Sequence, residues 1–320
     1  MPGRNRGTWS SRVSFIGNWS YPLCSLIAMG LTPLISAEWN WRVQLLIPAI
    51  LSLIATALAW RYFPESPRWL ESRGRYQEAE KVMRSIEEGV IRQTGKPLPP
   101  VVIADDGKAP QAVPYSALLT GVLLKRVILG SCVLIAMNVV QYTLINWLPT
   151  IFMTQGINLK DSIVLNTMSM FGAPFGIFIA MLVMDKIPRK TMGVGLLILI
   201  AVLGYIYSLQ TSMLLITLIG FFLITFVYMY VCYASAVYVP EIWPTEAKLR
   251  GSGLANAVGR ISGIAAPYAV AVLLSSYGVT GVFILLGAVS IIVAIAIATI
   301  GIETKGVSVE SLSIDAVANK

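Results

Sequence analysis

Residues 62–75 read YFPESPRWLESRGR, and they follow directly on an apolar run, 43–60, that contains no charged side chain. Pro64 cannot continue a helix, because proline lacks the amide N–H and clashes with the preceding turn. Ser66 and Pro67 suit the N-cap and the first position of a new helix. The stretch therefore predicts that a long apolar helix ends here and that a short, charged helix begins.

The predicted short helix extends from Pro67 to about Ser72 and stops at Gly74, with Trp69 at the depth of lipid headgroups. A second, amphipathic helix is expected over 76–91, because its apolar residues recur at helical spacing. Residues 96–114 are rich in proline and aspartate, which indicates a linker.

Long stretches of the chain carry no charge at all. Only 12% of the residues are charged, against about 25% in soluble domains. The charge-free runs are 13–37, 43–60, 127–159, 162–184, 191–240 and 261–302. A helix needs about 20 apolar residues to cross about 30 Å of hydrocarbon, and polar breaks at 210–212 and 275–278 divide the last two runs. We therefore expect eight membrane-spanning helices, near 13–37, 43–61, 127–153, 162–184, 191–209, 213–239, 251–274 and 279–302.

Basic residues fall almost entirely on one side of these predicted spans. When alternate loops are assigned to opposite sides, one side carries 21 of the 24 Lys and Arg residues. The other side carries only Arg42 and Lys160. Because positive charge marks the cytoplasmic side of a membrane, we expect both termini and the loop 61–126 in the cytoplasm. The net charge of +8 then needs no nucleic-acid partner.

The sequence contains no histidine, and its three cysteines stand alone in apolar spans. This composition removes histidine-based catalysis and offers no CxxC or similar metal-ligand spacing. A membrane enzyme would also need clustered acids or a nucleophile beside a base, whereas Asp185 and Glu241 are isolated in the sequence. We therefore expect neither an enzyme nor a bound metal or cofactor.

Two short sequence features each occur twice along the chain, and the distance in residues between the two copies is nearly the same for both. Pro2 and Pro244 each precede a basic residue and a helix-opening glycine, 242 residues apart, and Glu65 and Glu303 each follow a span, 238 residues apart. We infer that predicted spans one and two correspond to spans seven and eight. Counterparts of spans three to six would then precede residue 1, so that the chain represents about eight of twelve spans.

Four motifs carry a family resemblance. They are PESPRWLESRGRYQEAEKVM (64–83), MDKIPRK (184–190), VPEIWPTEAKLRGSGLANAVGR (239–260) and ETKGVSVESLS (303–313). Each resembles a motif of sugar-porter-like and organic-ion-transporter-like members of the major facilitator superfamily, in the same order and at the same span boundaries. The chain is similar in particular to inner-membrane metabolite transport proteins of enterobacteria.

The resemblance implies an all-α integral membrane fold of the major facilitator type, with a complete C-terminal six-helix half and the last two helices of the N-terminal half. Residues 1–63 would hold these two N-terminal spans, and 64–126 a cytoplasmic central loop with amphipathic helices. Residues 127–302 would form the six-helix half, and 303–320 a cytoplasmic tail.

Polar side chains inside the predicted spans are candidates for substrate binding, because they are costly in lipid and tend to face a cavity or a partner. Amide and phenol groups follow one face of the third span, and similar stripes on the first and sixth spans include Tyr21 and Tyr228. Hydrogen bonding between helices is the alternative role. The uncharged candidates are Asn138, Gln141, Tyr142, Asn146, Trp147 and Tyr228.

Arg260 lies inside a predicted span, nine residues past Gly251 and so about 13 Å deep at about 1.5 Å per residue. An unpaired arginine there costs at least about 2.5–3.5 kcal/mol, and no predicted span offers an interior Asp or Glu. Its partner is then carbonyl dipoles and water, an acid on a helix that precedes residue 1, or an anionic substrate. We include Arg260 among the substrate-binding candidates.

Charged residues at the cytoplasmic ends of the spans are candidates for a conformational latch, because such charges can pair in one state and separate in another. The latch candidates are Asp185, Lys186, Arg189, Lys190, Glu65, Arg68, Glu241, Lys248 and Arg250.

Two stripes of small residues, one from Gly251 to Gly263 and one from Gly172 to Ala180, allow close approach of helices. In the family fold we expect the first stripe to meet the second span of the full protein. The second stripe is expected to meet the fifth family span, which corresponds to 13–37 here.

The resemblance implies a secondary active transporter that moves a small polar metabolite across the inner membrane by alternating access, ion-coupled in the full-length parent. Its partners would be the substrate, lipid and a coupling proton, and we expect a monomer. Sugar porters carry a glutamine pair where this chain has Ala136 and Met137, so an organic acid is as plausible as a sugar-like compound. The alternative is a transport-inactive remnant or a sensor-like membrane protein.

Overall fold

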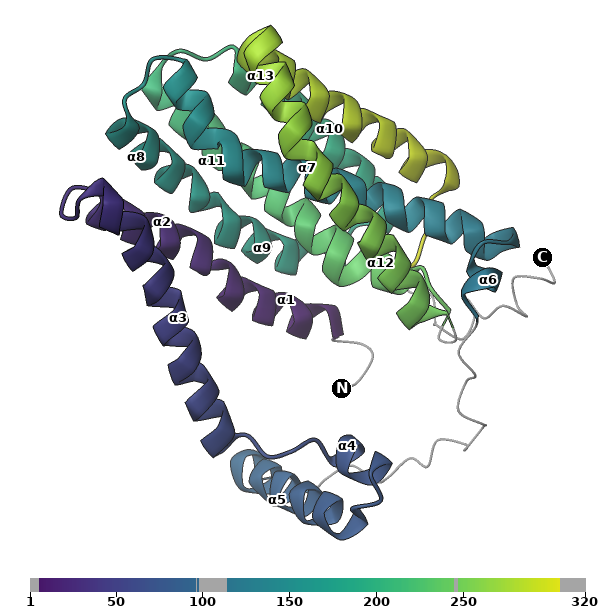
Figure 1. Ribbon diagram of the computed structural model, residues 1–320. Coiled ribbons are helices and arrows are strands. Elements are labelled where there is room, and N and C mark those ends of the chain that lie inside the picture. Colours follow the sequence, from purple (N-terminus) through teal and green to yellow (C-terminus); the bar gives the residue numbers. More distant parts are fainter. Residues whose placement is uncertain (1–5, 96, 98–113, 245–246, 306–320) are drawn as a thin grey trace. The chain divides into compact units, whose positions relative to one another are not determined.

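The computed structural model describes residues 6–95, 97, 114–244 and 247–305, and these residues form helices without any strand. The chain divides into two compact units, Met1–Pro33 with Pro110–Lys320, and Leu34–Ala109, and each is described by itself. Figure 1 labels the α-helices of both units. The larger unit contains α1 (Arg6–Asn18), α2 (Ser20–Leu31), α6 (Tyr115–Leu118), α7 (Gly121–Thr154), α8 (Leu159–Met170), α9 (Gly172–Val183), α10 (Arg189–Ser208), α11 (Met213–Val231), η2 (Cys232–Tyr238), α12 (Val239–Glu241) and α13 (Lys248–Ile300).

Six helical stretches among the described residues are long and apolar enough to cross a membrane. They are Glu38–Tyr62, Gly121–Thr154, Leu159–Val183, Arg189–Ser208, Met213–Glu241 and Lys248–Ile300. The last of these has 53 residues, which at about 1.5 Å per residue is more than twice the length of one span. The prediction of an all-α, multi-pass membrane protein is therefore confirmed.

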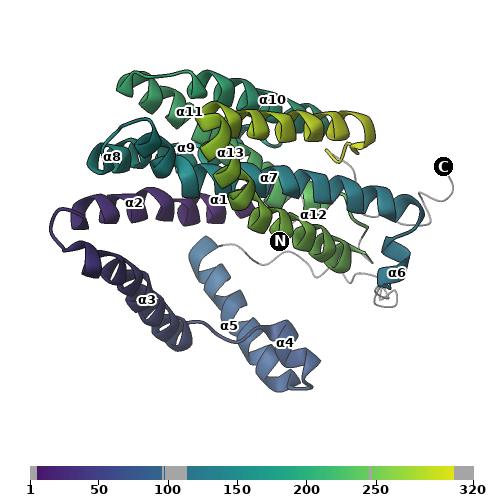
Figure 2. The same ribbon diagram turned by 45° about the horizontal axis from the view of Figure 1, so that its top comes forward.

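The helix α13 consists of two arms that meet at a sharp bend (Figures 1 and 2). At the bend Gly278 has φ +64° and ψ −162°, a backbone conformation that glycine adopts without steric cost. The bend lies within the polar break predicted at 275–278. The two arms thus correspond to the two spans predicted over 251–274 and 279–302.

The first predicted span is interrupted, and so is the fourth. Helix α1 gives way to α2 at Trp19, three residues before Pro22, and α8 gives way to α9 at Phe171, three residues before Pro174. Each proline removes the N–H that would have bonded to the last carbonyl of the first helix. Trp19 and Phe171 meet edge to face, with ring centroids 6.5 Å apart.

These two interrupted pairs lie side by side. Helix α1 packs along α9, and α2 packs along α8 (Figures 1 and 2). The breaks at Trp19 and Phe171 therefore face one another across the packed pairs.

Helix α7 packs extensively against α13, and close contacts at small residues hold this interface together. A Cβ on Gly259 would lie 2.8 Å from Leu134 Cβ and 2.9 Å from Asn138 Nδ2, and a Cβ on Gly263 would lie 3.1 Å from the Tyr142 ring. The stripe on α13 therefore meets α7 within this chain.

The small-residue stripe on α9 packs against α11. A Cβ on Gly172 would lie 2.9 Å from the backbone nitrogen of Thr225, and one on Gly176 would collide with the Thr225 carbonyl. The expected partner, the first predicted span, does contact α9 through α1, while the atoms nearest to the two glycines belong to α11.

The smaller unit contains α3 (Ala37–Tyr62), α4 (Pro67–Ser72) and α5 (Tyr76–Thr94). Helix α4 has the predicted bounds, with Pro67 at its first position, and α5 covers the predicted amphipathic helix and ends at Gly95, whose φ is +63°. The apolar side chains of α3 are exposed, as expected of a helix that faces lipid.

Candidate functional site

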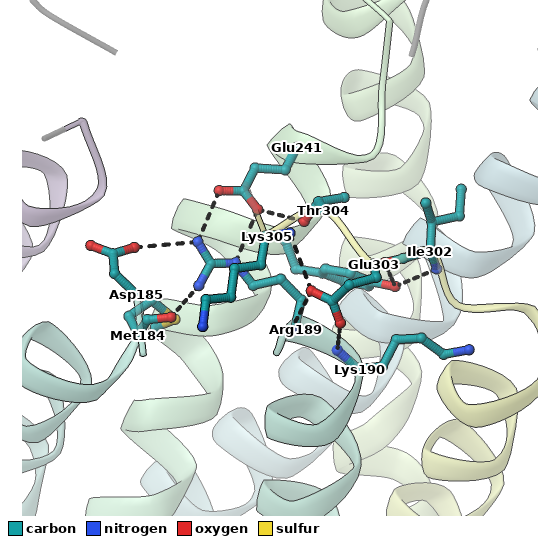
Figure 3. A network of polar contacts seen from close by, with 10 residues as sticks. Met184, Asp185, Arg189, Lys190, Glu241, Ile302, Glu303, Thr304 and Lys305 are labelled. Carbon is teal, nitrogen blue, oxygen red and sulfur yellow. Dashed lines mark hydrogen bonds and ion pairs between the residues drawn. The ribbon is translucent and has the colours of Figure 1, made fainter. Parts of the chain in front are cut away.

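A network of charged side chains surrounds Arg189, the first residue of α10 (Figure 3). Its guanidinium donates to both carboxylate oxygens of Glu241, at 3.1 and 3.3 Å, and to Asp185 at 3.3 Å. It also donates to the carbonyl of Met184. Arg189 is only 5% exposed, and a forked contact with a carboxylate is the geometry that best compensates a buried guanidinium. The network thus joins the α9–α10 loop to α12.

Glu303, just past the end of α13, completes this network from a third segment. Its carboxylate accepts the backbone N–H groups of Arg189 at 2.8 Å, of Lys190 at 3.2 Å and of Lys305 at 3.1 Å. Glu303 therefore caps the N-terminus of α10, where the residue at the N-cap position makes no side-chain cap. Burial opposes ionisation, but the three N–H donors and the Arg189 charge outweigh it and lower the pKa of Glu303.

Two neighbours of Glu303 hold the same segment in place. Thr304 donates its hydroxyl to Glu241 at 2.6 Å, and the Lys305 ammonium donates to the Lys186 carbonyl at 2.6 Å. The C-terminal segment therefore contacts both of the elements that Arg189 joins (Figure 3).

The helix η2 connects α11 to this network. It is a π-helix, a form that often occurs at functional sites. Tyr233 and Tyr238 lie five residues apart and stack with ring centroids 5.0 Å apart and an angle of 15°. The Tyr238 hydroxyl accepts the Ile302 N–H at 3.0 Å and donates to the Ile302 carbonyl at 3.1 Å. The end of this span is thereby fixed to the C-terminal segment.

Five of the nine latch candidates gather in this network. Asp185, Arg189 and Glu241 meet through their side chains. Lys186 and Lys190 take part through backbone atoms, a carbonyl and an N–H group. Sequence reasoning missed Glu303, Thr304 and Lys305 as members, although the motif ETK marks the same three positions.

The other four latch candidates lie elsewhere. Lys248 begins α13, and the guanidinium of Arg250 lies 5.3 Å from the ring centroid of Tyr115. Glu65 belongs to the smaller unit and accepts the N–H of Ser66. Arg68 lies in α4 of that unit, and its side chain lies outside the described part of the chain.

The substrate candidates on α7 have different surroundings in the structure. Asn138 is 2% exposed, donates to the Leu134 carbonyl at 2.7 Å and packs against Gly259 of α13. Asn146 is exposed and Trp147 is half-buried. The predicted stripe therefore does not line a single surface.

Arg260 is exposed and donates a hydrogen bond to the hydroxyl of Tyr142 across the α7–α13 interface. No carboxylate among the described residues forms an ion pair with it. A guanidinium has five N–H donors, so this contact leaves capacity for a further acceptor. The pair places a cation and a phenol together within the span.

Gln141 and Tyr228 come together between α7 and α11. Tyr228 is fully buried and meets Tyr21 of α2 edge to face, with ring centroids 5.0 Å apart. Gln141 is half-buried beside the Tyr228 hydroxyl. Tyr21 belongs to a polar stripe of the sequence but was not among the predicted site residues.

The described residues contain no group of three or more His, Cys, Asp or Glu that could hold a metal ion. A bundle of apolar helices that carries polar groups inside its spans and a charged network at one end is an arrangement found in membrane transporters. The chain belongs to the Major Facilitator Superfamily, whose family model matches residues 1–267.

Relatives in this family are metabolite transporters rather than enzymes. The inner membrane metabolite transport protein YdjE of Escherichia coli is 44% identical over 98% of this chain and 69% of its own length. The niacin transporter NiaP of Acinetobacter baylyi is 25% identical over 98% of this chain and 70% of its length. The arabinose-proton symporter of Bacillus subtilis is 26% identical over 86% of this chain and 59% of its length. The chain is accordingly a multi-pass protein of the inner membrane.

The fold of the chain is similar to that of solved structures of the xylose transporter XylE. A structure of the xylose transporter XylE from E. coli in a partially occluded inward-open conformation matches with a TM-score of 0.69 and 18% identity, over 96% of this chain and 66% of that one. A second XylE structure, with a bound bromodeoxyglucose, matches with a TM-score of 0.63 and 22% identity, over 98% and 67%. These matches support the major facilitator fold.

Proposed function

We propose that the chain is a secondary active transporter that moves a small polar metabolite by alternating access, with both termini in the cytoplasm. The observation that carries this proposal is the network of Arg189, Glu241 and Glu303, which connects three segments at one end of the larger unit. Charges on separate elements that pair in one conformation and part in another are a common basis of switching. The names of the relatives favour transport over a sensor-like role.

The network would act as the cytoplasmic latch. Arg189 holds Glu241 and Asp185, and the C-terminal segment holds the start of α10 through Glu303. Movement of α12 relative to α10 would break the forked contact between Arg189 and Glu241. Ion coupling, with a proton as the coupling ion, is part of the proposal for the full-length parent and has support from the arabinose-proton symporter among the relatives.

The substrate we propose is a sugar-like compound or an organic acid that bears negative charge. The guanidinium of Arg260 places a positive charge within the span, and no carboxylate among the described residues pairs with it. A relative is named a niacin transporter, and niacin is a carboxylic acid, which supports an organic acid as the substrate.

Substitution of Arg260 tests the substrate role. Arg260→Gln removes the charge, and because a charged hydrogen bond contributes roughly 1.5–3 kcal/mol, affinity for an anionic metabolite should fall about 10- to 150-fold. Arg260→Lys keeps the charge but loses the planar fork, so an intermediate loss is expected. Binding is measured on purified protein against a panel of sugars and organic acids, by ligand-dependent thermal unfolding.

The same preparations provide the control. Monodisperse yield in detergent should hold for both variants, since removal of an intramembrane charge does not penalise insertion. Lost yield with normal affinity in the remaining folded protein would show that Arg260 is structural.

A further inference from the structure

The indole of Trp243 lies between α7 and α13, although Trp243 belongs to the segment that follows α12. It is fully buried, and by volume it is the largest side chain of the described residues that is. A Cβ on Gly251 of α13 would overlap the indole ring, and a Cβ on Gly130 of α7 would lie 3.7 Å from it. The ring therefore fills a slot that the two helices leave open because each has a glycine there.

A short piece of chain joins Trp243 to the charged network. Only Ile242 separates it from Glu241, and consecutive Cα atoms are about 3.8 Å apart. Ile242 is itself fully buried, and its backbone N–H bonds to the preceding helical turn at 3.1 Å. Glu241 is the residue that the Arg189 guanidinium holds. A shift of Glu241 must therefore move the indole as well, because no flexible linker lies between them.

The slot is the first in a row of contacts that continues along α7 and α13. The contacts involve small residues of α13 at four-residue intervals, and they pair Gly251 with Trp243, Ala255 with Gly130, Gly259 with Leu134 and Asn138, and Gly263 with Tyr142. The last of these residues of α7, Tyr142, accepts the hydrogen bond from Arg260. Packed interiors transmit a displacement because they contain few voids. The indole thus lies at one end of the interface that positions Arg260.

Shape rather than polar contact holds the indole in its slot. Its N–H makes no hydrogen bond with any residue that the structure describes, whereas a buried tryptophan N–H usually finds a partner. The ring can therefore shift without breaking a hydrogen bond, and a shift toward water would satisfy the N–H group. A smaller ring at Trp243 would remove packing alone.

We propose that Trp243 is a positioning residue that couples the cytoplasmic latch to the interface between α7 and α13. This inference rests on the proposed transport function and names the residue through which the latch acts on the spans. While Arg189 holds Glu241, the indole stays in its slot and fixes the approach of the two helices. When that contact breaks, α12 and the indole move together, and α7 and α13 repack along the row of contacts toward Arg260.

The first test changes the slot and measures the latch, because coupling between two places is reciprocal. Gly251→Ala adds a methyl group that overlaps the indole. Amide hydrogen exchange of the purified full chain should become about tenfold faster at residues 189–194 of α10, because the displaced indole weakens the charged contact of Arg189. Gly253→Ala is the matched control on the same helix, where a Cβ would meet no described atom within 4 Å, and it should leave this exchange unchanged.

The second test changes the latch and measures α7. Glu241→Gln weakens the contact with Arg189, and it should speed amide exchange at residues 127–134 about tenfold. In Trp243→Phe, whose smaller ring does not fill the slot, Glu241→Gln should still speed exchange at the start of α10 but leave α7 nearly unchanged. Phe283→Leu is the control for general loosening, because Phe283 is a buried aromatic residue that packs on Gly204 of α10. In that background the response of α7 should persist.

Each contrary result has a separate meaning. Equal exchange at α10 in Gly251→Ala and Gly253→Ala would overturn the coupling, and so would a full response of α7 to Glu241→Gln in the Trp243→Phe background. If a variant of one test fails to fold, the other test decides. If Glu241→Gln alters neither helix, the latch falls and this inference falls with it. Neither test uses a substrate, so the absence of solute exchange in proteoliposomes would refute the transport function separately.

Discussion

At the scale of single residues, Glu303 has a role that extends beyond its own segment. It follows α13 but caps α10, because its carboxylate accepts two N–H groups from the first residues of that helix. A negative charge at a helix N-terminus is stabilising. One side chain thus connects the end of the last span to the start of another, and the surrounding network depends on its ionisation.

The variant Glu303→Gln should lower the stability of the protein at neutral pH by about 1 kcal/mol, since it keeps an oxygen acceptor but removes the charge. Thermal unfolding in detergent measures the effect. Glu88→Gln, at an exposed position of α5, is the matched control and should have no effect.

The stability difference between wild type and Glu303→Gln should depend on pH, because the pKa of Glu303 is lowered in the folded protein. A carboxyl whose pKa is lower in the folded state contributes stability above its unfolded pKa, about 4.3. The contribution disappears as pH falls through the folded pKa. The gap between wild type and Glu303→Gln should therefore be constant from about pH 8 to about pH 5 and close in stronger acid. A gap that widens in acid would contradict this assignment.

At the scale of helices, a glycine contact determines how closely α9 and α11 approach. The backbone of α9 lies against that of α11 at Gly176, where a Cβ would collide with the Thr225 carbonyl. A backbone atom cannot move aside as a flexible side chain can. We therefore expect Gly176→Ala to separate these helices.

Gly176→Ala should reduce the monodisperse yield in detergent severely, whereas Gly195→Ala should not. Gly195 lies in α10, and a Cβ added there would have no neighbouring atom within 4 Å among the described residues, so the same change of residue type meets open space. Size-exclusion chromatography after extraction compares the two. Equal yields would show that the α9–α11 approach is looser than described.

The sequence predicted these glycine stripes but not their partners. The spacing alone shows that one face of a helix carries small residues. Which helix packs against that face depends on the arrangement of all the spans. The contact of Gly259 with Leu134 and Asn138 of α7, for example, was not predicted. The bend at Gly278, in contrast, could be predicted from the local sequence, because a polar break and a glycine interrupt an otherwise apolar run.

The candidate site was predictable to a similar extent. Arg189, Glu241 and Asp185 were recognisable as charges beside span ends, and the structure brings them together. The sequence placed Tyr21 on a polar stripe of the first span, but it could not show which residue Tyr21 contacts. The structure shows that this residue is Tyr228.

At the scale of the whole molecule, the distribution of charge predicts the orientation in the membrane. Tags placed at positions 100, 188 and 318 should report the cytoplasm, and tags at 40, 157 and 277 the periplasm. The reason is that one set of alternate loops carries 21 of the 24 basic residues. Reporter fusions measure each position separately, and a periplasmic signal at position 100 would reverse the assignment.

Solute exchange by the purified chain in proteoliposomes decides most directly whether the protein is a transporter. Vesicles are loaded with a mixture of sugars, organic acids and hydroxylated acids, and their contents are followed by mass spectrometry against protein-free vesicles. We predict selective loss of one or a few small polar metabolites, with slower loss in Arg260→Gln. Contents that match those of protein-free vesicles for every solute would contradict the proposed function.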